Sequence, residues 1–458
     1  MTLNYSLQLS EQIKEMMRSD LSGQFKTYLP IELIANYQSD TNRRDRVYNN
    51  ETTLLTMIIS ATQEDKSLQN SVNIYSEIHK RNIPEIQRRI EESINKEREK
   101  DKALGKRRGK PKTYKPRIAK SKLQTISTNT GSYTTARKRL DIEMVKMVYE
   151  ESANFENTGL NNKWKGMRVL ITDGTYIQMQ DSKELREIYD VKSDSESYKS
   201  AYPQGLLQVM IEQGSGAILD FELGNRHVSE LELVTKLLSR LPQGSLLLAD
   251  DLYSCYSIFH LVKSTGLEII VPGKRERKYK VIKTIGKGDE IVELTKKEHP
   301  NWLSKDVKLP KTLLMRRLSF EDPINPGKEY VIFTTIMDET ISMADIVAKY
   351  FTRWDIEISI REIKTLMDIN VIRSKTPDLV MKELLTAFIS YNLIRKIISK
   401  ATEQSGFSPE GCIIQKYLET GKTVFMDKKG RIYQRWSPGR YGNTSGANIS
   451  TYNSKETR

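Results

Sequence analysis

Residues 167–175 read MRVLITDGT, a short run of β-forming side chains that ends at Asp173 and a turn-forming glycine. A second apolar run, SLLLA at residues 245–249, is followed directly by Asp250 and Asp251. Helical patterns separate and follow these runs, so we expect strands that alternate with helices. The pattern favours an α/β fold in which Asp173 and Asp250 lie just past the ends of buried strands, where side chains can enter a crevice.

These two aspartates are candidate ligands for a divalent metal ion. Mg²⁺ prefers oxygen ligands, and carboxylates that lie close together repel one another unless a cation neutralises them. Two such ions about 4 Å apart can activate the attacking oxygen and stabilise the leaving oxygen of a phosphodiester. A single aspartate after a strand is more often a turn former or a helix cap, so this interpretation needs a third carboxylate.

The third carboxylate is found in a segment that is predicted to be one long helix, residues 344–368. Within it, YFTRWDIEISIREIK spaces its polar side chains so that Tyr350, Arg353, Glu357 and Lys364 share an arc of about 60°. This edge offers a carboxylate between cations beside an apolar stripe. A surface helix with ordinary ion pairs at i,i+3 and i,i+4 is an equally good interpretation of the pattern alone.

The charge of the chain points to a polyanionic partner. Lys plus Arg is 73 and Asp plus Glu is 59, a net +14, and residues 96–122 alone carry thirteen basic and three acidic residues, a net +10. Such a run is either a solvated linker or an arm that follows a phosphate backbone. The candidate phosphate contacts are Lys106, Arg107 and Arg108, and also Arg137 and Arg139 near the start of a helix expected at residues 133–150.

Several classes of protein are not supported by the sequence. No apolar run approaches the roughly 18 residues of a membrane span, and residues 1–10 do not resemble a secretory signal. Two cysteines and four scattered histidines argue against a disulfide framework and a zinc site. The P-loop motif is absent, so no nucleotide or organic cofactor is indicated. We therefore expect a soluble intracellular protein of the cytoplasm that is not associated with a membrane.

The spacing Tyr-x2-Arg-x3-Glu-x6-Lys of residues 350–364 resembles the signature of DDE transposases of the IS-four family of bacterial insertion sequences. Residues 164–182 and 244–262 resemble the first and second aspartate blocks of that family. Further blocks match in the same order from about residue 50 to about residue 400, at residues 132–140, 286–304, 309–320 and 373–396. The chain is identified on these blocks as a member of the family.

The resemblance implies a role for each residue of the signature. Asp173, Asp250 and Glu357 would bind two Mg²⁺ ions, for which Mn²⁺ can substitute. Arg353 and Lys364 would hold DNA phosphates near the transposon end, and Tyr350 would contact DNA beside them. The spacings of 77 and 107 residues between the three carboxylates (250 − 173 and 357 − 250) leave room for an insertion before the glutamate.

Two positions depart from the family pattern. Asp251 stands where the family usually has an arginine, which removes a cation and leaves open whether Asp251 assists or competes with Asp250. Tyr330, in the strand-like segment 329–335, stands where hairpin-forming relatives stack a tryptophan on a flipped base. A tyrosine ring can also stack on a base, but a strand residue packed on its neighbour is an equally good interpretation.

The expected fold is a ribonuclease H-like α/β core with an inserted β-strand subdomain and helical flanks. The core would comprise residues 131–273, with a preceding helix, and residues 336–372, with the glutamate helix. The insertion would occupy residues 274–335. The flanks would be a helical DNA-binding region at residues 1–95, a basic linker at residues 96–130, and a helical region with a basic tail at residues 373–458.

The expected function is that of a cut-and-paste DNA transposase. It would bind terminal inverted repeats in duplex DNA, cut there by metal-dependent hydrolysis and transesterification, and join the element to target DNA. Its partners would be both of these DNAs and, in the paired-end complex, a second protomer. Two alternatives remain open: a DNA-binding regulator derived from a transposase, and a metal-dependent nuclease that cuts without joining.

Overall fold

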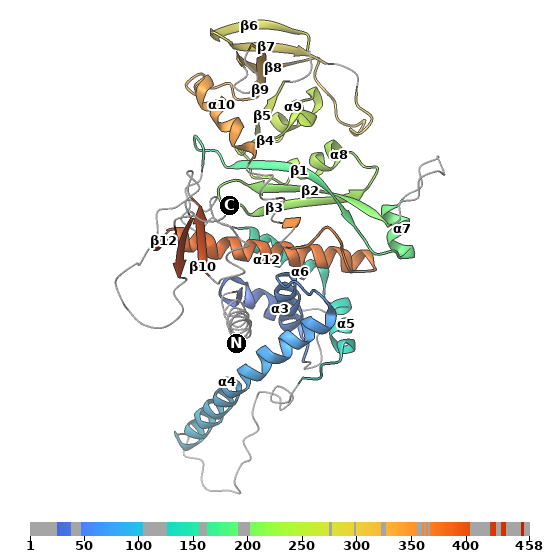
Figure 1. The fold of residues 1–458 in the computed structure, drawn as a ribbon, viewed down its shortest axis with the longest axis vertical. Helices are drawn as coiled ribbons and strands as arrows, with labels where there is room; N and C mark the ends of the chain where they lie inside the picture. The colour runs from blue at the N-terminus through green and yellow to red at the C-terminus, as the bar shows by residue number, and fades with distance from the viewer. Residues whose placement is uncertain are drawn as a thin grey trace. The chain divides into compact units, whose positions relative to one another are not determined.

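The computed structural model groups the chain into two compact units (Figure 1). One comprises Met1–Glu151 and Met381–Ser390, and the other comprises Ser152–Val380 and Tyr391–Arg458. The structure describes residues 25–37, 47–103, 126–154, 163–190, 202–273, 277–296, 299–321, 327–354, 360, 363–364, 367–403, 422–426, 432–436 and 450–452.

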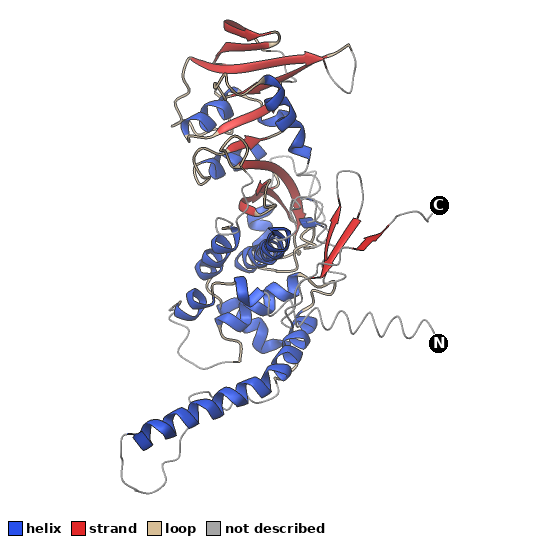
Figure 2. Cartoon of the chain, turned by 90° about the vertical axis from the view of Figure 1, so that its left-hand side faces the viewer, coloured by secondary structure: helices blue, strands red, loops and turns tan. Residues whose placement is uncertain are grey.

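The first unit is helical throughout its described residues (Figure 2). Its helices are α2 (Ile31–Asn36), α3 (Asn50–Ala61), α4 (Leu68–Ala103), α5 (Thr130–Arg139) and most of α6 (Ile142–Ala153). The side chain of Asn49 caps α3 by accepting a hydrogen bond from the Thr52 amide at 2.8 Å. The helical pattern predicted in the N-terminal region is confirmed over α2, α3 and α4, including the break between Ala61 and Leu68.

The prediction of one helix across residues 133–150 is wrong, because α5 and α6 are separate. Leu140 leaves the helical conformation with φ −56° and ψ 128°, and the Asp141 side chain accepts a hydrogen bond from the Glu143 amide at the start of α6. The buried amine of Lys382 donates to the carbonyl oxygens of Arg137 and Lys138 at 3.4 and 3.3 Å. Carbonyl groups in the last turn of α5 thus accept hydrogen bonds from the Lys382 amine, not from the amides of a further helical turn.

A nine-stranded sheet forms the centre of the second unit, with the order β3-β2-β1-β4-β5-β9-β8-β7-β6. The first three strands pair antiparallel, and the central strands β1, β4 and β5 pair parallel. This half of the sheet comprises β1 (Val169–Gln178), β2 (Gln204–Glu212), β3 (Ile218–Asn225), β4 (Leu246–Leu248) and β5 (Glu268–Pro272). The predicted hairpin around residues 213–216 is confirmed as the β2–β3 connection.

The strand-rich segment predicted at residues 274–335 continues the same sheet from β5 outward. Its strands are β6 (Tyr279–Gly286), β7 (Asp289–Thr295), β8 (Thr312–Glu321) and β9 (Glu329–Thr334). All four pair antiparallel, and β9 joins them to β5 through Ile270 and Thr334. The chain therefore makes a long excursion between β5 and the segment that leads to Glu357.

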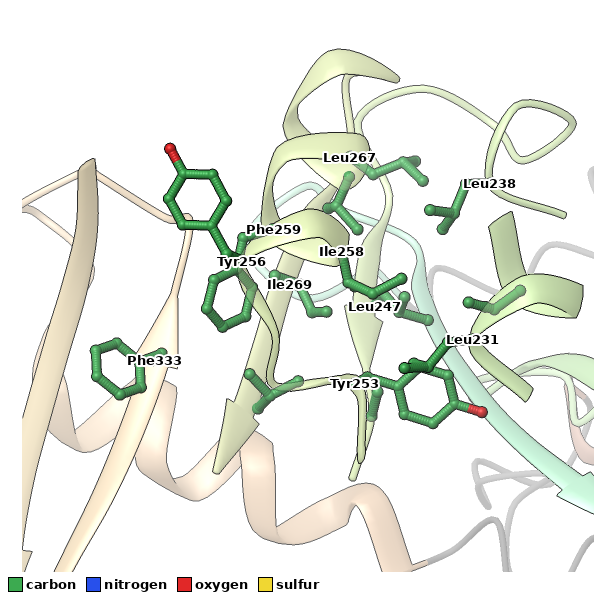
Figure 3. Packing of buried hydrophobic residues seen from close by; sticks show 14 of the residues in the cluster. Leu231, Leu238, Leu247, Tyr253, Tyr256, Ile258, Phe259, Leu267, Ile269 and Phe333 are labelled. Atoms are coloured by element: carbon green, nitrogen blue, oxygen red, sulfur yellow. The ribbon is translucent and has the colours of Figure 1, made fainter. Parts of the chain in front are cut away.

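Helices pack on the sheet through apolar side chains (Figure 3). The helices of this unit are α7 (Lys183–Tyr189), α8 (Glu230–Leu238), the 3₁₀ turn η3 (Asp251–Tyr253), α9 (Tyr256–Ser264) and α10 (Met343–Phe351). Buried side chains of α8 and α9, such as Leu231 and Phe259, share one cluster with Leu247 of β4 and Ile269 of β5. Each fully buried side chain of this size contributes about 2 kcal/mol of hydrophobic free energy. Among the described helices, none is long and apolar enough to cross a membrane.

The single helix predicted for residues 344–368 is interrupted in the structure. The α-helix α10 ends at Phe351, and the 3₁₀ turn η4 (Thr352–Trp354) follows. The side chain of Gln213 donates to the Thr352 carbonyl at 3.0 Å and accepts from the Lys349 amine at 2.5 Å. Because that carbonyl is bonded to Gln213 in the β2–β3 turn, the helix tightens at this point instead of continuing.

The C-terminal region combines a long helix with strands that the sequence did not predict. The helix α12 (Pro377–Glu403) confirms the helix expected at residues 378–401. Beyond it, β10 (Lys422–Met426), β11 (Ile432–Trp436) and β12 (Ser450–Tyr452) form an antiparallel three-stranded sheet. The basic tail is therefore not purely helical or irregular.

A buried ion pair connects the outer strands to the loop before α10. The Arg316 side chain of β8 is 1% exposed and donates to both carboxylate oxygens of Asp289 in β7, at 2.8 and 2.6 Å. It also donates to the carbonyl oxygens of Asp338 and Ile341 at 2.9 and 3.0 Å. All four bonds fall within hydrogen-bonding geometry, so this buried charge is well compensated.

We predict that Arg316→Ala lowers the free energy of unfolding by about 3–5 kcal/mol, because Asp289 would be left charged and buried. Urea unfolding of the full chain measures this change. The matched control is Arg240→Ala, whose partners Asp220 and Glu222 are at the surface, and whose loss should cost less than about 1 kcal/mol. Equal effects of the two substitutions would contradict the assignment of Arg316 as a buried anchor.

Candidate active site

The parallel register between β1 and β4 brings Asp173 and Asp250 together. The last pair in that register joins Ile171 to Leu248, and each aspartate lies two residues beyond it. Because side chains alternate along extended backbone, both carboxylates extend from the face of the sheet that Ile171 and Leu248 share. The opposite face, which includes Leu247, packs on α8 and α9.

The prediction that Asp173 lies past the end of its strand is wrong, although Asp173 does lie near Asp250. β1 continues to Gln178, and Asp173 pairs with Val209 of β2 within the antiparallel ladder. Only the parallel pairing of β1 with β4 ends before Asp173, because β4 ends at Leu248. Asp173 is therefore held by a continuous strand on one side and faces the open end of β4 on the other.

Asp250 lies past the end of β4, as predicted, and it also caps a helical turn. Its Oδ1 accepts a hydrogen bond from the Leu252 amide at 2.9 Å, at the start of η3. The ordinary interpretation of this aspartate as a cap is thus confirmed. The bond fixes one carboxylate oxygen, and the same carboxylate still lies beside Asp173.

Electrostatic coupling joins Asp173 to three of the predicted site residues. Burial raises the pKa of its carboxyl group, and the nearby Asp250 carboxylate raises that pKa further. A hydrogen bond from the Gly174 amide, at 2.9 Å, and the charges of Arg353 and Lys364 act in the opposite direction. The structure therefore places Asp250, Arg353 and Lys364 within electrostatic reach of Asp173.

The third predicted carboxylate, Glu357, lies outside the described residues, as do Lys106, Arg107 and Arg108. Over the part of the chain that the structure describes, no three His, Cys, Asp or Glu side chains are grouped to hold a metal ion. The two aspartates nevertheless fit a hard divalent cation, because both offer carboxylate oxygens and a bound cation would offset the effect of the Asp250 charge on the pKa of Asp173.

Tyr350 is packed inside an aromatic group and is only 5% exposed. Its ring centroid lies 6.3 Å from that of Tyr330 and 5.8 Å from that of Phe351. Burial, together with its interactions with Tyr330, raises the pKa of the Tyr350 hydroxyl. The neighbouring Arg353 has a buried Nε without a hydrogen-bond partner among the described residues.

Tyr330 lies on β9 and packs on its neighbours. Its ring centroid is 5.4 Å from that of Phe320 on the paired strand β8, and 5.8 Å from that of Phe351. The side chain remains partly exposed. Packing on a neighbouring strand residue is thus observed, and the role of Tyr330 in stacking on a base stays a prediction.

The two cations predicted on the preceding helix lie on α5, in the first unit. Arg139 donates to the Tyr48 carbonyl at 2.8 Å, and the Arg137 guanidinium lies over the Tyr133 ring at 5.9 Å from its centroid. Both side chains are partly exposed. Their described contacts hold them against their own unit.

A carboxylate that the sequence did not single out, Glu230, lies behind the two aspartates. It begins α8, and a side chain on Gly174 would place its Cβ 2.5 Å from the Glu230 carboxyl carbon. Burial raises the pKa of Glu230, and the charges of Asp173 and Asp250 raise it further. In the sequence, Glu230 resembles an ordinary first-turn acidic residue after the Ser229 cap, so only the glycine beside Asp173 hinted at a close approach.

Comparison with known proteins gives consistent findings. The family described as "Transposase DDE domain" matches residues 164–393. The transposase InsG for insertion sequence element IS4 of Escherichia coli (strain K12) is 28% identical over 315 residues, which are 67% of this chain and 68% of that protein. A putative transposase of the same organism, InsZ, is 28% identical over 125 residues, 27% of this chain and 42% of that protein.

Among solved structures, a piggyBac transposase synaptic complex with hairpin DNA is a distant neighbour. Its TM-score is 0.37 at 11% sequence identity, with 90% of this chain and 79% of that chain covered.

We predict that Asp173→Asn raises the melting temperature at pH 7 when no divalent metal is present. A folded-state pKa above the unfolded value means that the ionised carboxyl group destabilises the native state. The gain should therefore shrink as the pH falls and should vanish well below about 4, the ordinary pKa of an aspartate, because the wild-type carboxyl group is then protonated in both states. Calorimetry across this pH range measures the effect. Asp338→Asn is the control, because hydrogen bonds from Thr340 lower the pKa of Asp338 and its loss should not stabilise. A melting temperature that Asp173→Asn lowers at pH 7 would contradict the prediction.

Proposed function

Because this chain belongs to the transposase DDE domain family, we propose that it cuts the ends of its own element at a metal site formed by Asp173, Asp250 and Glu357. The family match covers residues 164–393, half of the chain. The predictions of a DNA transposase, and of an enzyme that cuts DNA and transfers strands, are thereby confirmed. Divalent metal ions are the cofactors of this family, and the choice of Mg²⁺, the number of ions and the ligands are our proposal.

The observation that carries the proposal is the β1–β4 register. It supports a shared site because Asp173 and Asp250 both lie two residues beyond the pair Ile171–Leu248, on one face of the sheet. Glu357 would complete the set from the segment that follows η4. Two Mg²⁺ ions bound there, or Mn²⁺ in their place, would activate the attacking oxygen and stabilise the leaving oxygen.

The side chains of this site have distinct tasks in the proposed reaction. The two aspartates hold their negative charges at fixed positions, one on a continuous strand and one through its cap on η3. Arg353 and Lys364, which act electrostatically on Asp173, would hold the phosphates of the cut strand in line for attack. Tyr350 is buried, so its contribution would be to pack beside Arg353 and offer at most its edge to DNA.

Each chemical step is a displacement at phosphorus. Water attacks the phosphorus at the element end, the bond from phosphorus to the 3′ oxygen breaks, and a 3′-hydroxyl is released. This hydroxyl attacks the opposite strand, so a hairpin phosphodiester forms as the bond on that strand breaks. Water then opens the hairpin and releases the 3′-hydroxyl again. The 3′-hydroxyl finally attacks the target DNA, where one phosphodiester forms as another breaks. The excised element is thus joined to a new site in a cut-and-paste reaction.

The organisation that supports this chemistry remains part of the proposal. The strand order β3-β2-β1-β4-β5, with antiparallel pairs followed by parallel pairs, supports a ribonuclease H-like core at residues 131–273 and 336–372. Residues 274–335 would be its insertion, and the helical residues 1–95 would bind the terminal repeats. The linker 96–130, with Lys106, Arg107 and Arg108, would follow the DNA backbone, as would Arg137 and Arg139 on α5.

Assembly and location extend the same proposal. Two protomers would hold the paired element ends, each end wrapped by the excess positive charge, before target DNA is captured. The enzyme would act at the bacterial nucleoid, where both DNAs are found. Residues 373–458 would add a helix and the small C-terminal sheet to this assembly.

The deciding experiment is cleavage of duplex DNA that carries the element's own ends, in Mg²⁺. We predict that Asp173→Asn, Asp250→Asn and Glu357→Gln each reduce cutting by at least about 10³-fold while binding of the ends is unchanged, because the carboxylates act in chemistry and not in end recognition. Asp338→Asn serves as the control and should cut normally.

Each other outcome would indicate a different function for this protein. Specific binding without cutting by the native chain would indicate a regulator, and cutting without strand transfer would indicate a nuclease. If Glu357→Gln cuts as well as the native protein, Glu357 is not a metal ligand and the site must be reassigned.

Tyr330 has a separate test, which rests on its partly exposed ring. If it stacks on a flipped base, Tyr330→Ala should spare the first nick and reduce hairpin formation by about tenfold, the effect of about 1–2 kcal/mol of stacking. Tyr330→Phe keeps the ring and should behave as the native protein. Hairpin yield measured on end-labelled DNA gives the answer, and an unchanged yield with alanine would leave Tyr330 as a packing residue only.

A further inference from the structure

A chain of buried hydrogen bonds runs behind the two aspartates. The Gln208 amide nitrogen of β2 donates to the Thr172 hydroxyl and to the Tyr253 hydroxyl, each at 2.7 Å. The Tyr253 hydroxyl in turn donates to the Glu230 carboxylate at 3.2 Å. Gln208 and Tyr253 are 0% exposed and Thr172 is 3% exposed, so water does not compete for these bonds.

In the structure, the Thr172 and Tyr253 hydroxyls each accept one hydrogen bond and donate another. The Thr172 hydroxyl donates its proton to the Val209 carbonyl at 3.0 Å and therefore accepts from Gln208. The Tyr253 hydroxyl donates to Glu230 and also accepts from Gln208. Both N–H groups of the Gln208 amide thus donate within this series, and its buried oxygen Oε1 has no hydrogen-bond partner among the described residues.

Thr172 and Tyr253, the two residues that Gln208 connects by hydrogen bonds, lie close to the two aspartates in the sequence. Thr172 directly precedes Asp173, and its acceptor Val209 is the residue that pairs with Asp173 across the ladder. Tyr253 closes η3, the turn that Asp250 caps. Figure 3 shows the Tyr253 ring beside Leu231, with its hydroxyl pointing away from the hydrophobic cluster. The bonds between Thr172, Gln208 and Tyr253 therefore connect the backbone around one aspartate to the backbone around the other.

We propose that Tyr253 is a positioning residue that sets the separation of the Asp173 and Asp250 carboxylates through Gln208 and Thr172, and so sets the affinity for divalent ions. The parallel ladder between β1 and β4 ends at Ile171 and Leu248, so it does not itself fix the residues beyond. The hydrogen bonds of Gln208 to Thr172 and to Tyr253 connect the two backbone segments beyond the end of that ladder. This inference rests on the proposed metal site.

The fit at Gly174 supports the same role. A Cβ at this position would lie 2.5, 2.8 and 2.8 Å from the Cδ, Cγ and Oε1 atoms of Glu230. The absence of a side chain beside Asp173 therefore lets the Glu230 carboxylate reach the Tyr253 hydroxyl. Outer hydrogen bonds of this kind orient metal ligands, and their loss commonly weakens metal affinity by about 10–100-fold.

The test is Mn²⁺ binding by the full chain without DNA, measured from the EPR signal of the free ion. Tyr253→Phe should weaken the tightest binding by about tenfold, because the ring is kept and only the hydroxyl is lost. Tyr256→Phe is the matched control, since its hydroxyl donates to the Pro310 carbonyl away from the aspartates, and it should bind Mn²⁺ normally. Equal affinities of the native chain and Tyr253→Phe would overturn the proposal.

Two further variants separate hydrogen bonding from charge and from folding. Glu230→Gln keeps an acceptor for the Tyr253 hydroxyl and should retain most of the affinity; a loss as large as that of Tyr253→Phe would mean that charge, not positioning, is responsible. Thr172→Val removes the other end of the chain and should weaken Mn²⁺ binding in the same way. It decides the question if Tyr253→Phe does not fold, and normal binding by it would then overturn the proposal.

Asp173→Asn distinguishes this inference from the function on which it rests. It should abolish the tightest Mn²⁺ binding altogether. If Asp173→Asn binds as the native chain does, the proposed metal site itself is wrong. If Asp173→Asn loses the ion and Tyr253→Phe does not, the site stands and only the positioning role is rejected.

Discussion

Three parallel residue pairs between β1 and β4, the last of them Ile171 with Leu248, determine where the charged side chains of this enzyme meet. A slip of one residue in this register would turn one aspartate to the face that packs on α8 and α9. Burial of a carboxylate in that apolar cluster would be prohibitive without a partner. The hydrophobic residues on the two faces of β4 therefore protect the geometry of the site as well as the core.

The same geometry has an electrostatic consequence. Asp173 is partly buried beside Asp250, and Glu230 lies behind both, so burial and the charge of nearby carboxylates raise the pKa of Asp173 and the pKa of Glu230. The charges of Arg353 and Lys364 lower the pKa of Asp173 and so offset part of this effect. Excess negative charge of this kind destabilises the free protein and favours cation binding, the usual compromise between stability and activity at a catalytic site.

Local patterns in the sequence were enough to predict the buried strands, the β2–β3 hairpin, α12 and the position of Asp250. These local patterns gave wrong predictions where contacts with residues far away in the sequence determine the structure. Asp173 is in mid-strand because β2 continues to pair with it, and the helix before Glu357 is interrupted because Gln213, over 130 residues earlier in the chain, binds the Thr352 carbonyl. Glu230 escaped notice for the same reason, since its approach to Gly174 exists only after folding.

The placement of Arg353 shows how far these distant contacts reach into function. The loop before α10 is held by Arg316, which binds the Ile341 carbonyl just ahead of the Ser342 cap. The other end of α10 is held by Gln213. Side chains from strand β8 and from the β2–β3 turn thus hold the two ends of α10, so the 3₁₀ turn that carries Arg353 starts from a fixed point. The long excursion through β6–β9 thus does more than lengthen the sheet, because it supplies Arg316 and with it one of the two anchors of the helix that leads to Glu357.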